Sequence, residues 1–176
     1  MAELPKRKPT RLKGYDYSQN GAYFVTVCTD MGKQVLGDIS VGKGLAPSEN
    51  CLSEYGKIAE EQLMGLEQRY DFIKIQKYVI MPNHIHIIIM IMRDEAAGAS
   101  PCPTLSDVIC TYKSLTTRLC KKSGYNEKRL FQRSFHDHII RNERDYQKIW
   151  EYIETNPIRW KEDCFYPGQA EREQSL

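Results

Sequence analysis

Two apolar runs separated by a single Pro-Asn pair constrain the fold of this chain more than any other feature. The runs are FIKIQKYVIM (72–81) and HIHIIIMIM (84–92). The first alternates polar and apolar residues and both are rich in isoleucine, a pattern that indicates strands. Because only Pro82-Asn83 lies between them, we expect the two strands to pair antiparallel as a hairpin.

The other predicted elements complete a ferredoxin-like sandwich. We expect two further strands, at 22–29 and 133–140, and three helices, at 53–69, at 104–122 and from Asn142 to the residues before Pro157. Ser53, the pair Thr104 and Asp107, and Asn142 are the predicted helix caps. The order β-α-β-β-α-β-α predicts an α+β fold of the split β-α-β type, with an antiparallel sheet and helices on one face.

The chain is expected to form one catalytic domain with short polar ends. Its 176 residues suit a single core. We expect a basic N-terminal arm over 1–20, the domain over 21–168 and a disordered tail over 169–176. Residues 38–52 are rich in Gly, Ser, Pro and Asn, and they are predicted to form a loop with room for a short hairpin.

Charge and cysteine spacing exclude several classes of protein. The formal net charge is only +2, which argues against a general nucleic-acid coat protein but allows a local basic patch. No two of the six cysteines have CxxC spacing, so a structural zinc knuckle is not predicted. The N-terminus has no secretory signal and no apolar run is long enough to span a bilayer. We therefore expect a cytoplasmic protein with no membrane partner.

The histidines of the HIHIIIMIM run are candidate metal ligands. His84 and His86 stand at positions i and i+2 of a strand and so share one face, with Ile85 on the other. Two imidazoles this close suit a single divalent cation. The alternative is that they are partly exposed strand histidines that bind nothing.

The last predicted helix presents Tyr152 and Asn156 on one face, because they are four residues apart. The Asn156 amide oxygen could complete a metal site. Pro157 disfavours the α conformation at Asn156, so we expect Asn156 at the helix end. The alternative is a core tyrosine followed by a helix C-cap.

Four segments carry a resemblance to a known family. The segments MPNHIHIII (81–89) and EYIETNP (151–157) resemble the single-tyrosine HUH transposases of insertion sequences. RLKGYDYSQNGAYFVTVCT (11–29) and FQRSFHDHIIRNERDYQKIWEYIETNPIRW (131–160) are similar to the REP-associated tyrosine transposases, bacterial relatives tied to repetitive extragenic palindromes. The resemblance covers about residues 11–163, and it is the combination of motifs that is specific.

This resemblance implies a metal-dependent endonuclease and strand transferase that acts on single-stranded or hairpin DNA. His84 and His86 match the metal ligands, the metal would be Mg²⁺ or Mn²⁺, and Tyr152 matches the nucleophile that forms a 5′-phosphotyrosine. Asn156 occupies a position where the insertion-sequence enzymes carry Gln, the third ligand, and Asn is shorter by one methylene. Those enzymes exchange the tyrosine helix between two subunits, so a homodimer is one expectation and a monomer the other.

A second tyrosine competes with Tyr152 for the role of nucleophile. Tyr146 lies six residues earlier, which turns it by about 240° around the helix axis. The two side chains therefore cannot serve the same face, and we interpret Tyr146 as a packing residue.

Candidate DNA-binding cations gather in two segments. They are Lys6, Arg7, Lys8, Arg11 and Lys13 in the arm and Lys113, Arg118, Lys121 and Lys122 in the predicted helix 104–122. Any one of them could instead be an ordinary solvated charge. His136 and His138 share a face of the fourth strand, where they either contact DNA or are structural, and the structural reading is also our interpretation of Tyr15 and Tyr17.

Two rival functions stay open at this point. One is a domesticated hairpin-binding protein that kept the fold and lost turnover. The other is a histidine-triad nucleotide hydrolase, although that family has a third histidine two residues after the second, where this chain has Ile88. A covalent protein–DNA adduct distinguishes the transposase-like enzyme from both.

Overall fold

The computed structural model describes residues 14–40, 49–93 and 103–167. Within these ranges no helix is long and apolar enough to cross a membrane. The elements follow in the order β1 (Gly21–Cys28), η1 (Asp30–Gly32), β2 (Gly37–Ser40), β3 (Glu49–Leu52), α1 (Glu54–Met64), α2 (Leu66–Arg69), β4 (Ile73–Ile80), β5 (His84–Ile91), α3 (Leu105–Lys122), β6 (His136–Ile140), α4 (Glu143–Thr155) and η2 (Trp160–Glu162).

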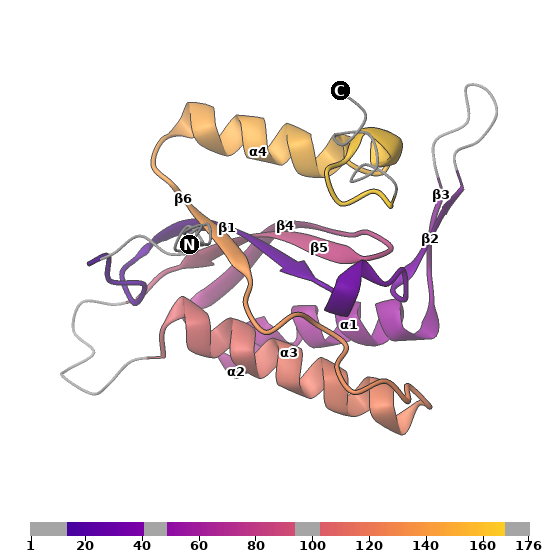
Figure 1. Cartoon of the computed structure of the whole chain (residues 1–176). Helices are drawn as coiled ribbons and strands as arrows, with labels where there is room; N and C mark the ends of the chain where they lie inside the picture. Colours follow the sequence, from indigo (N-terminus) through magenta and orange to yellow (C-terminus); the bar gives the residue numbers. More distant parts are fainter. Residues whose placement is uncertain (1–13, 41–48, 94–102, 168–176) are drawn as a thin grey trace, which may run out of the picture.

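The main sheet has four antiparallel strands in the order β4-β5-β1-β6, with β1 and β5 at its centre (Figure 1). This is the strand order of the split β-α-β fold, so the predicted α+β, ferredoxin-like class is confirmed. The predicted hairpin is β4-β5, in which Ile80 pairs with Ile85. A second hairpin, β2-β3, forms at the ends of the Gly- and Ser-rich loop.

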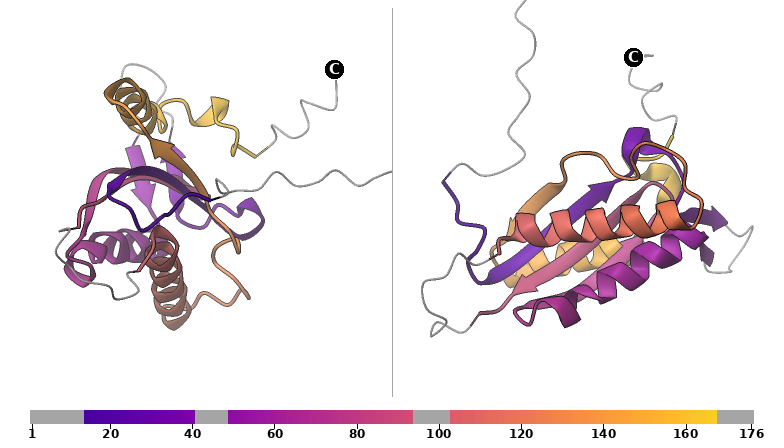
Figure 2. Two further views of the ribbon diagram at one scale, coloured as in Figure 1. Left: turned by 90° about the vertical axis from the view of Figure 1, so that its left-hand side faces the viewer. Right: turned by 90° about the horizontal axis from the view of Figure 1, so that it is seen from below.

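Helices cover both faces of the sheet, and here the expectation of helices on one face is wrong for α4. Figures 1 and 2 show α1 and α3 on one side of the sheet and α4 on the other. In β1 and β5, odd-numbered residues such as Val25 and Ile87 pack toward α1 and α3. Even-numbered residues such as Ile88 pack with Ile153 of α4. A strand that is apolar on both faces, as β5 is, needs cover on both, and α4 supplies the second layer.

Local capping signals place the helix starts as predicted. The Ser53 hydroxyl accepts a hydrogen bond from the Gly56 amide, and Asn142 caps α4 through the Asp145 amide. Thr104 and Asp107 form a reciprocal capping box at the start of α3. The helix expected over 53–69 is divided at Gly65 into α1 and α2.

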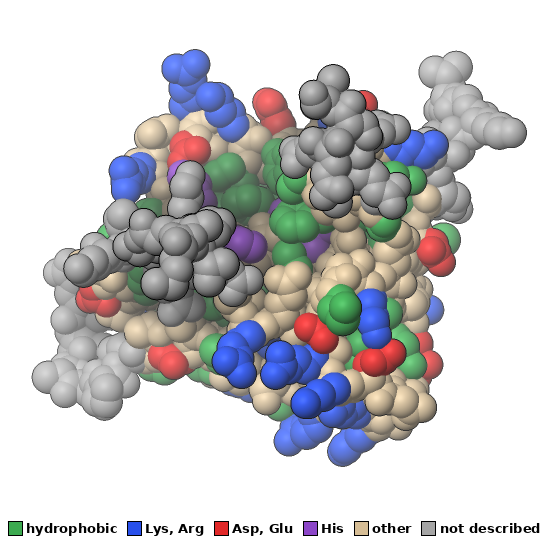
Figure 3. All heavy atoms as spheres, in the orientation of Figure 1, with side chains coloured by type: hydrophobic (Ala, Val, Ile, Leu, Met, Phe, Trp, Pro, Cys, Tyr) green, Lys and Arg blue, Asp and Glu red, His purple; other side chains and the backbone are tan. Residues whose placement is uncertain are grey.

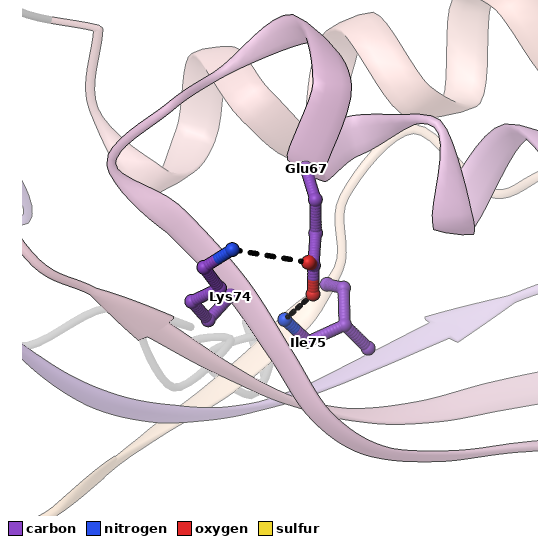
Figure 4. A network of polar contacts seen from close by, with 3 residues as sticks. All are labelled: Glu67, Lys74 and Ile75. Atoms are coloured by element: carbon purple, nitrogen blue, oxygen red, sulfur yellow. Dashed lines mark hydrogen bonds and ion pairs between the residues drawn. The ribbon is translucent and has the colours of Figure 1, made fainter.

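A carboxylate from α2 supports an irregular point in β4. The register of β4 against β5 shifts between Ile75 and Lys77. There the amide of Ile75 donates to Glu67, at 2.7 Å, and Lys74 lies 3.4 Å from the same carboxylate (Figure 4). Glu67 thus satisfies an amide that the strand pairing leaves free.

Strand β6 begins at His136, three residues later than predicted. In the segment before the strand, the Lys113 ammonium of α3 donates to the backbone carbonyls of Gln132, Arg133 and Ser134, at 2.6, 2.9 and 3.3 Å. These carbonyls are therefore satisfied by a side chain rather than by a neighbouring strand.

Candidate active site

Asn83 fixes the tautomer of the first histidine. The Asn83 amide nitrogen donates to the backbone carbonyls of Gly32 and Phe165, at 3.3 and 2.8 Å. Its oxygen must therefore be the acceptor in the 2.9 Å contact with Nδ1 of His84. The proton of His84 then sits on Nδ1, and Nε2 carries a lone pair. That Nε2 atom is buried and has no hydrogen-bond partner.

The second histidine is held between β1 and α4. His86 pairs with Thr26 across the sheet, and its Nδ1 lies 2.8 Å from the Thr26 hydroxyl. Its Nε2 lies 3.1 Å from the hydroxyl of Tyr152. The two imidazole rings are 4.4 Å apart, centroid to centroid, on the face predicted by their i, i+2 spacing.

Asp163 joins the tyrosine to the predicted third ligand. Its Oδ2 accepts hydrogen bonds from the Tyr152 hydroxyl at 3.1 Å and from the Asn156 amide nitrogen at 2.7 Å. Its Oδ1 accepts from the Phe165 amide at 2.7 Å. Because the Asn156 amide nitrogen faces Asp163, the Asn156 oxygen is left buried and without a partner.

The helix end at Asn156 differs in one respect from expectation. Asn156 closes α4, as predicted, but it keeps helical dihedrals, with φ −56° and ψ −43°, despite Pro157. Its hydrogen bond to Asp163 is one tertiary contact available to oppose the local preference against that conformation. With helical dihedrals retained, Asn156 stays on the same helix face as Tyr152, four residues earlier.

The site is closed on the histidine side and open at the tyrosine. His84, His86 and Asn156 are almost completely buried, whereas Tyr152 is 40% exposed. Aromatic rings cover His84, with Phe165 at 4.6 Å and Trp160 at 5.9 Å between centroids. A cavity of about 160 Å³, lined by residues of α4 and the segment after it, opens beside Tyr152.

Burial keeps all three ring systems uncharged. It lowers the pKa of His84 to about 3. Burial, followed by the neighbouring His84, lowers the pKa of His86, which Asp163 opposes. Burial, followed by the Asp163 charge, raises the pKa of Tyr152. Both imidazoles are therefore neutral at pH 7, the form that ligates a metal ion.

The donor set fits a divalent cation. Ligand atoms of His84, His86 and Asp163 lie within 4.8 Å of one another, so these residues could hold a metal ion. The buried lone pair of His84 Nε2 and the buried oxygen of Asn156 are polar atoms without partners, and such atoms call for an explanation. A cation bound by the histidines would satisfy the His84 atom.

The other residues singled out in the sequence lie outside this cluster. Tyr146 packs against the cluster of Ile88, Ile140 and Ile153, with its ring 5.9 Å from that of Trp150 between centroids. It lies on a different face of α4 from Tyr152. Tyr15 and Tyr17 pack in the main core. His138 pairs with Asp145 at 2.8 Å and His136 is exposed on the α4 face of β6. The arm cations Lys6, Arg7, Lys8, Arg11 and Lys13 lie outside the described residues.

The cations predicted on helix 104–122 lie on α3, on the opposite face of the sheet from α4. Lys113, Arg118 and Lys121 line a groove beside the segment that follows α3. Lys122 is exposed and is not among the residues that line it.

Three residues of the site were missed by sequence reasoning. Asn83 stands next to His84 in the Pro-Asn turn, and that adjacency was an available signal. Thr26 shows no signal until the register of β1 on β5 is known. Asp163 follows the last predicted helix in a segment without periodicity, and only the folded chain brings it to Tyr152.

The four-stranded antiparallel sheet and its helices are shared with a solved transposase structure. A solved REP-associated tyrosine transposase bound to a REP hairpin superposes with a TM-score of 0.59, over 91% of this chain and 74% of that one, at 20% identity. The similarity at this identity establishes the shared fold.

The sequence itself is similar to two proteins of Haemophilus influenzae. One, an uncharacterized protein, is 28% identical over 180 residues, which cover 94% of this chain and 96% of the relative. The other bears the name "Putative REP-associated tyrosine transposase" and is 24% identical over 147 residues, covering 82% and 74%. No protein-family model matches the chain. The chain is thus similar, in sequence and in fold, to REP-associated tyrosine transposases.

Proposed function

We propose that this protein is a metal-dependent endonuclease and strand transferase that cuts single-stranded DNA beside a hairpin, with Tyr152 as the nucleophile. The observation that carries the proposal is the 3.1 Å contact between the Tyr152 hydroxyl and Nε2 of His86. It places the one exposed member of the site against a buried imidazole pair suited to a cation. The solved structure with the same fold was bound to a REP hairpin, which suggests the substrate class.

The reaction forms one bond and breaks one bond at phosphorus. The Tyr152 oxygen attacks the scissile phosphate, and a 5′-phosphotyrosine forms as the bond from phosphorus to the 3′-oxygen breaks. The 3′-oxygen takes a proton from solvent water and leaves as a hydroxyl. The phenol proton passes to Asp163, whose Oδ2 already accepts it at 3.1 Å. A later attack by a 3′-hydroxyl on the phosphotyrosine reverses these steps and rejoins a strand without a nucleotide cofactor.

Mg²⁺ or Mn²⁺ is the proposed cofactor. When bound, such an ion would polarise the scissile phosphate and fix its orientation. His84 and His86 would each contribute Nε2. We assign the third ligand to the Asn156 oxygen, because it is a buried acceptor without a partner, whereas both Asp163 oxygens already accept hydrogen bonds.

The decisive experiment compares Tyr152→Phe with Tyr146→Phe on a labelled hairpin that carries a single-stranded flank, with Mn²⁺ present. Each change removes one hydroxyl and keeps the ring. At about 1 kcal/mol for each hydrogen bond, Tyr152→Phe should lose roughly 2 kcal/mol of stability through its contacts with His86 and Asp163, and Tyr146→Phe should lose less. Tyr152→Phe should bind DNA and form no covalent adduct on a denaturing gel. Tyr146→Phe should form the adduct as the unmodified protein does.

Other outcomes would identify a different function. Cleavage by Tyr152→Phe with release of a free 5′-phosphate would indicate a metallonuclease that uses water. Loss of the adduct in Tyr146→Phe alone would move the nucleophile to that residue. Binding without an adduct in the unmodified protein would indicate a hairpin-binding protein without turnover.

The proposed tyrosine acts in cis, because Tyr152 contacts His86 of its own chain. A mixture of Tyr152→Phe protein with His86→Ala protein should therefore form no adduct. If the tyrosine helix were exchanged within a homodimer, the mixture would regain an intact site and activity would return.

The N-terminal arm, with its five cations at 6–13, is proposed to add phosphate contacts.

A further inference from the structure

A second concave surface lies across the sheet from α4, between α3 and the segment that follows it. Its volume is about 470 Å³, and the residues from α3 that line it recur at helical spacing. Segment 128–133 forms the opposite wall. The lining includes six cations and no carboxylate: Lys113, Arg118, Lys121, Lys128, Arg129 and Arg133. Figure 3 shows lysine and arginine side chains gathered over this part of the molecule.

Lys113 has a different task from the other five cations. Its ammonium donates hydrogen bonds to the carbonyls of Gln132, Arg133 and Ser134. These bonds connect the two walls of the groove. Arg118, Lys121, Lys128, Arg129 and Arg133 are exposed, and none forms an ion pair within the described part of the chain. The five unpaired cations therefore lie on a groove whose walls are connected by Lys113, and together they form a positively charged surface.

The groove lies at the same end of the sheet as the histidines. The Gln132 amide donates to the Cys28 carbonyl at 2.9 Å, and Cys28 is the β1 residue that pairs with His84. Thr29, the next residue, bridges to Phe131 and donates its amide to the Asn83 carbonyl at 2.9 Å. The floor of the groove and the candidate metal ligands are thus joined by consecutive backbone hydrogen bonds.

The dimensions suit a nucleic-acid backbone. From Lys113 to Lys121 the α3 wall extends roughly 12 Å, at 1.5 Å per residue. At about 3.4 Å per nucleotide along one strand of B-form DNA, that length matches three or four phosphates. We propose that this groove binds the phosphate backbone of the DNA whose scissile phosphate reaches Tyr152, so that the strand is held on both sides of the sheet end. The inference rests on the function proposed above.

The test replaces one arginine from each wall, Arg118→Gln with Arg129→Gln, and measures binding to the hairpin with its single-stranded flank from 50 to 300 mM salt. The matched control is Lys57→Gln with Arg69→Gln, which removes equal charge from exposed positions on α1 and α2. Two lost phosphate contacts should lower the slope of log affinity against log salt by about 1.4 to 1.8, which is roughly 25- to 60-fold weaker binding at 0.1 M salt. The control should keep the unmodified slope.

Cleavage separates failure of this inference from failure of the proposed function. At saturating DNA the groove variant should form the covalent adduct at the unmodified rate, because Tyr152 and the histidines are unchanged. An unchanged salt slope in the groove variant, or an equal loss in the control, would overturn the groove as a specific site. Loss of the adduct at saturating DNA with affinity retained would also overturn it, since the arginines would then act in the reaction itself. Failure of the unmodified protein to form an adduct would reject the proposed function instead.

Discussion

Asn83 offers the sharpest test of how the histidine pair is built. The oxygen of this buried side chain accepts a hydrogen bond from Nδ1–H of His84, and its nitrogen donates to the Gly32 and Phe165 carbonyls. It therefore sets which nitrogen of His84 is free and also ties the segment after α4 to the strand. Outer partners of metal-binding histidines commonly change metal affinity by about 10- to 100-fold when removed. We predict that Asn83→Ala loses both stability and metal affinity.

The sizes of the two losses follow from the contacts. The bonds to His84 and Phe165 are short, at 2.9 and 2.8 Å, and the bond to Gly32 is long, at 3.3 Å. Each short bond contributes about 1 kcal/mol and the long one less, so the free energy of unfolding should fall by roughly 2 to 3 kcal/mol. For a chain of this size that lowers Tm by about 4 to 12 °C. At Mn²⁺ a hundredfold above Kd, ion binding stabilises by about 2.7 kcal/mol, and a 10- to 100-fold weaker site reduces this to about 0.4 to 1.4 kcal/mol.

Thermal unfolding with and without Mn²⁺ measures both quantities, and two further variants separate them. Asn83→Asp keeps an acceptor facing His84 but loses both donated bonds, so Tm should fall while the response to Mn²⁺ persists. Asn20→Ala removes a comparable pair of hydrogen bonds, to Arg93, away from the site, and it should lower Tm without changing the Mn²⁺ response. A full Mn²⁺ response in Asn83→Ala would refute the positioning role.

The remaining predictions concern protons and the third ligand. Burial lowers the pKa of His84 to about 3. Below pH 6.5, His84 is therefore protonated in the unfolded chain and stays neutral in the folded chain. The free energy of unfolding should then fall by about 1.4 kcal/mol per pH unit for this residue as pH drops from 6.5 toward 4.5, and His84→Gln should show a correspondingly shallower decline in denaturant titrations. Asn156→Ala should weaken Mn²⁺ binding, measured by calorimetry, by tenfold or more; a larger loss in Asp163→Asn would assign the third ligand to Asp163. At saturating Mn²⁺, Asp163→Asn should slow adduct formation while His138→Gln, which touches none of these groups, should not.

The fold was predictable because its signals are local. The strand pair around Pro82-Asn83 and the caps at Ser53, Thr104 and Asn142 each depend on residues within a few positions of one another. Side-chain alternation along a strand is equally local, and it placed His84 and His86 on one face. Helical spacing placed Tyr152 and Asn156 together in the same way.

The second face of the sheet was not decided by local signals. A helix with one apolar side can cover either face of the sheet. The face that α4 covers depends on where β6 ends and on which apolar surface of the sheet is still uncovered. The continuous apolar character of β5 pointed to cover on both faces, but that pattern does not say which helix supplies it.

The sequence by itself determined the strand hairpin, the paired histidines and the helix that carries Tyr152, because each is encoded by residues close together in the chain. Only the tertiary structure brought Asp163 to Tyr152 and set Asn83 as the partner that frees His84 Nε2. It also turned the scattered cations of α3 and segment 128–133 into one groove. Asn83 is adjacent to His84, but its side chain is oriented by the distant carbonyls of Gly32 and Phe165. All these long-range contacts join segments whose spacing along the chain carries no periodic signal, so their geometry exists only once the sheet and its two helical layers have packed.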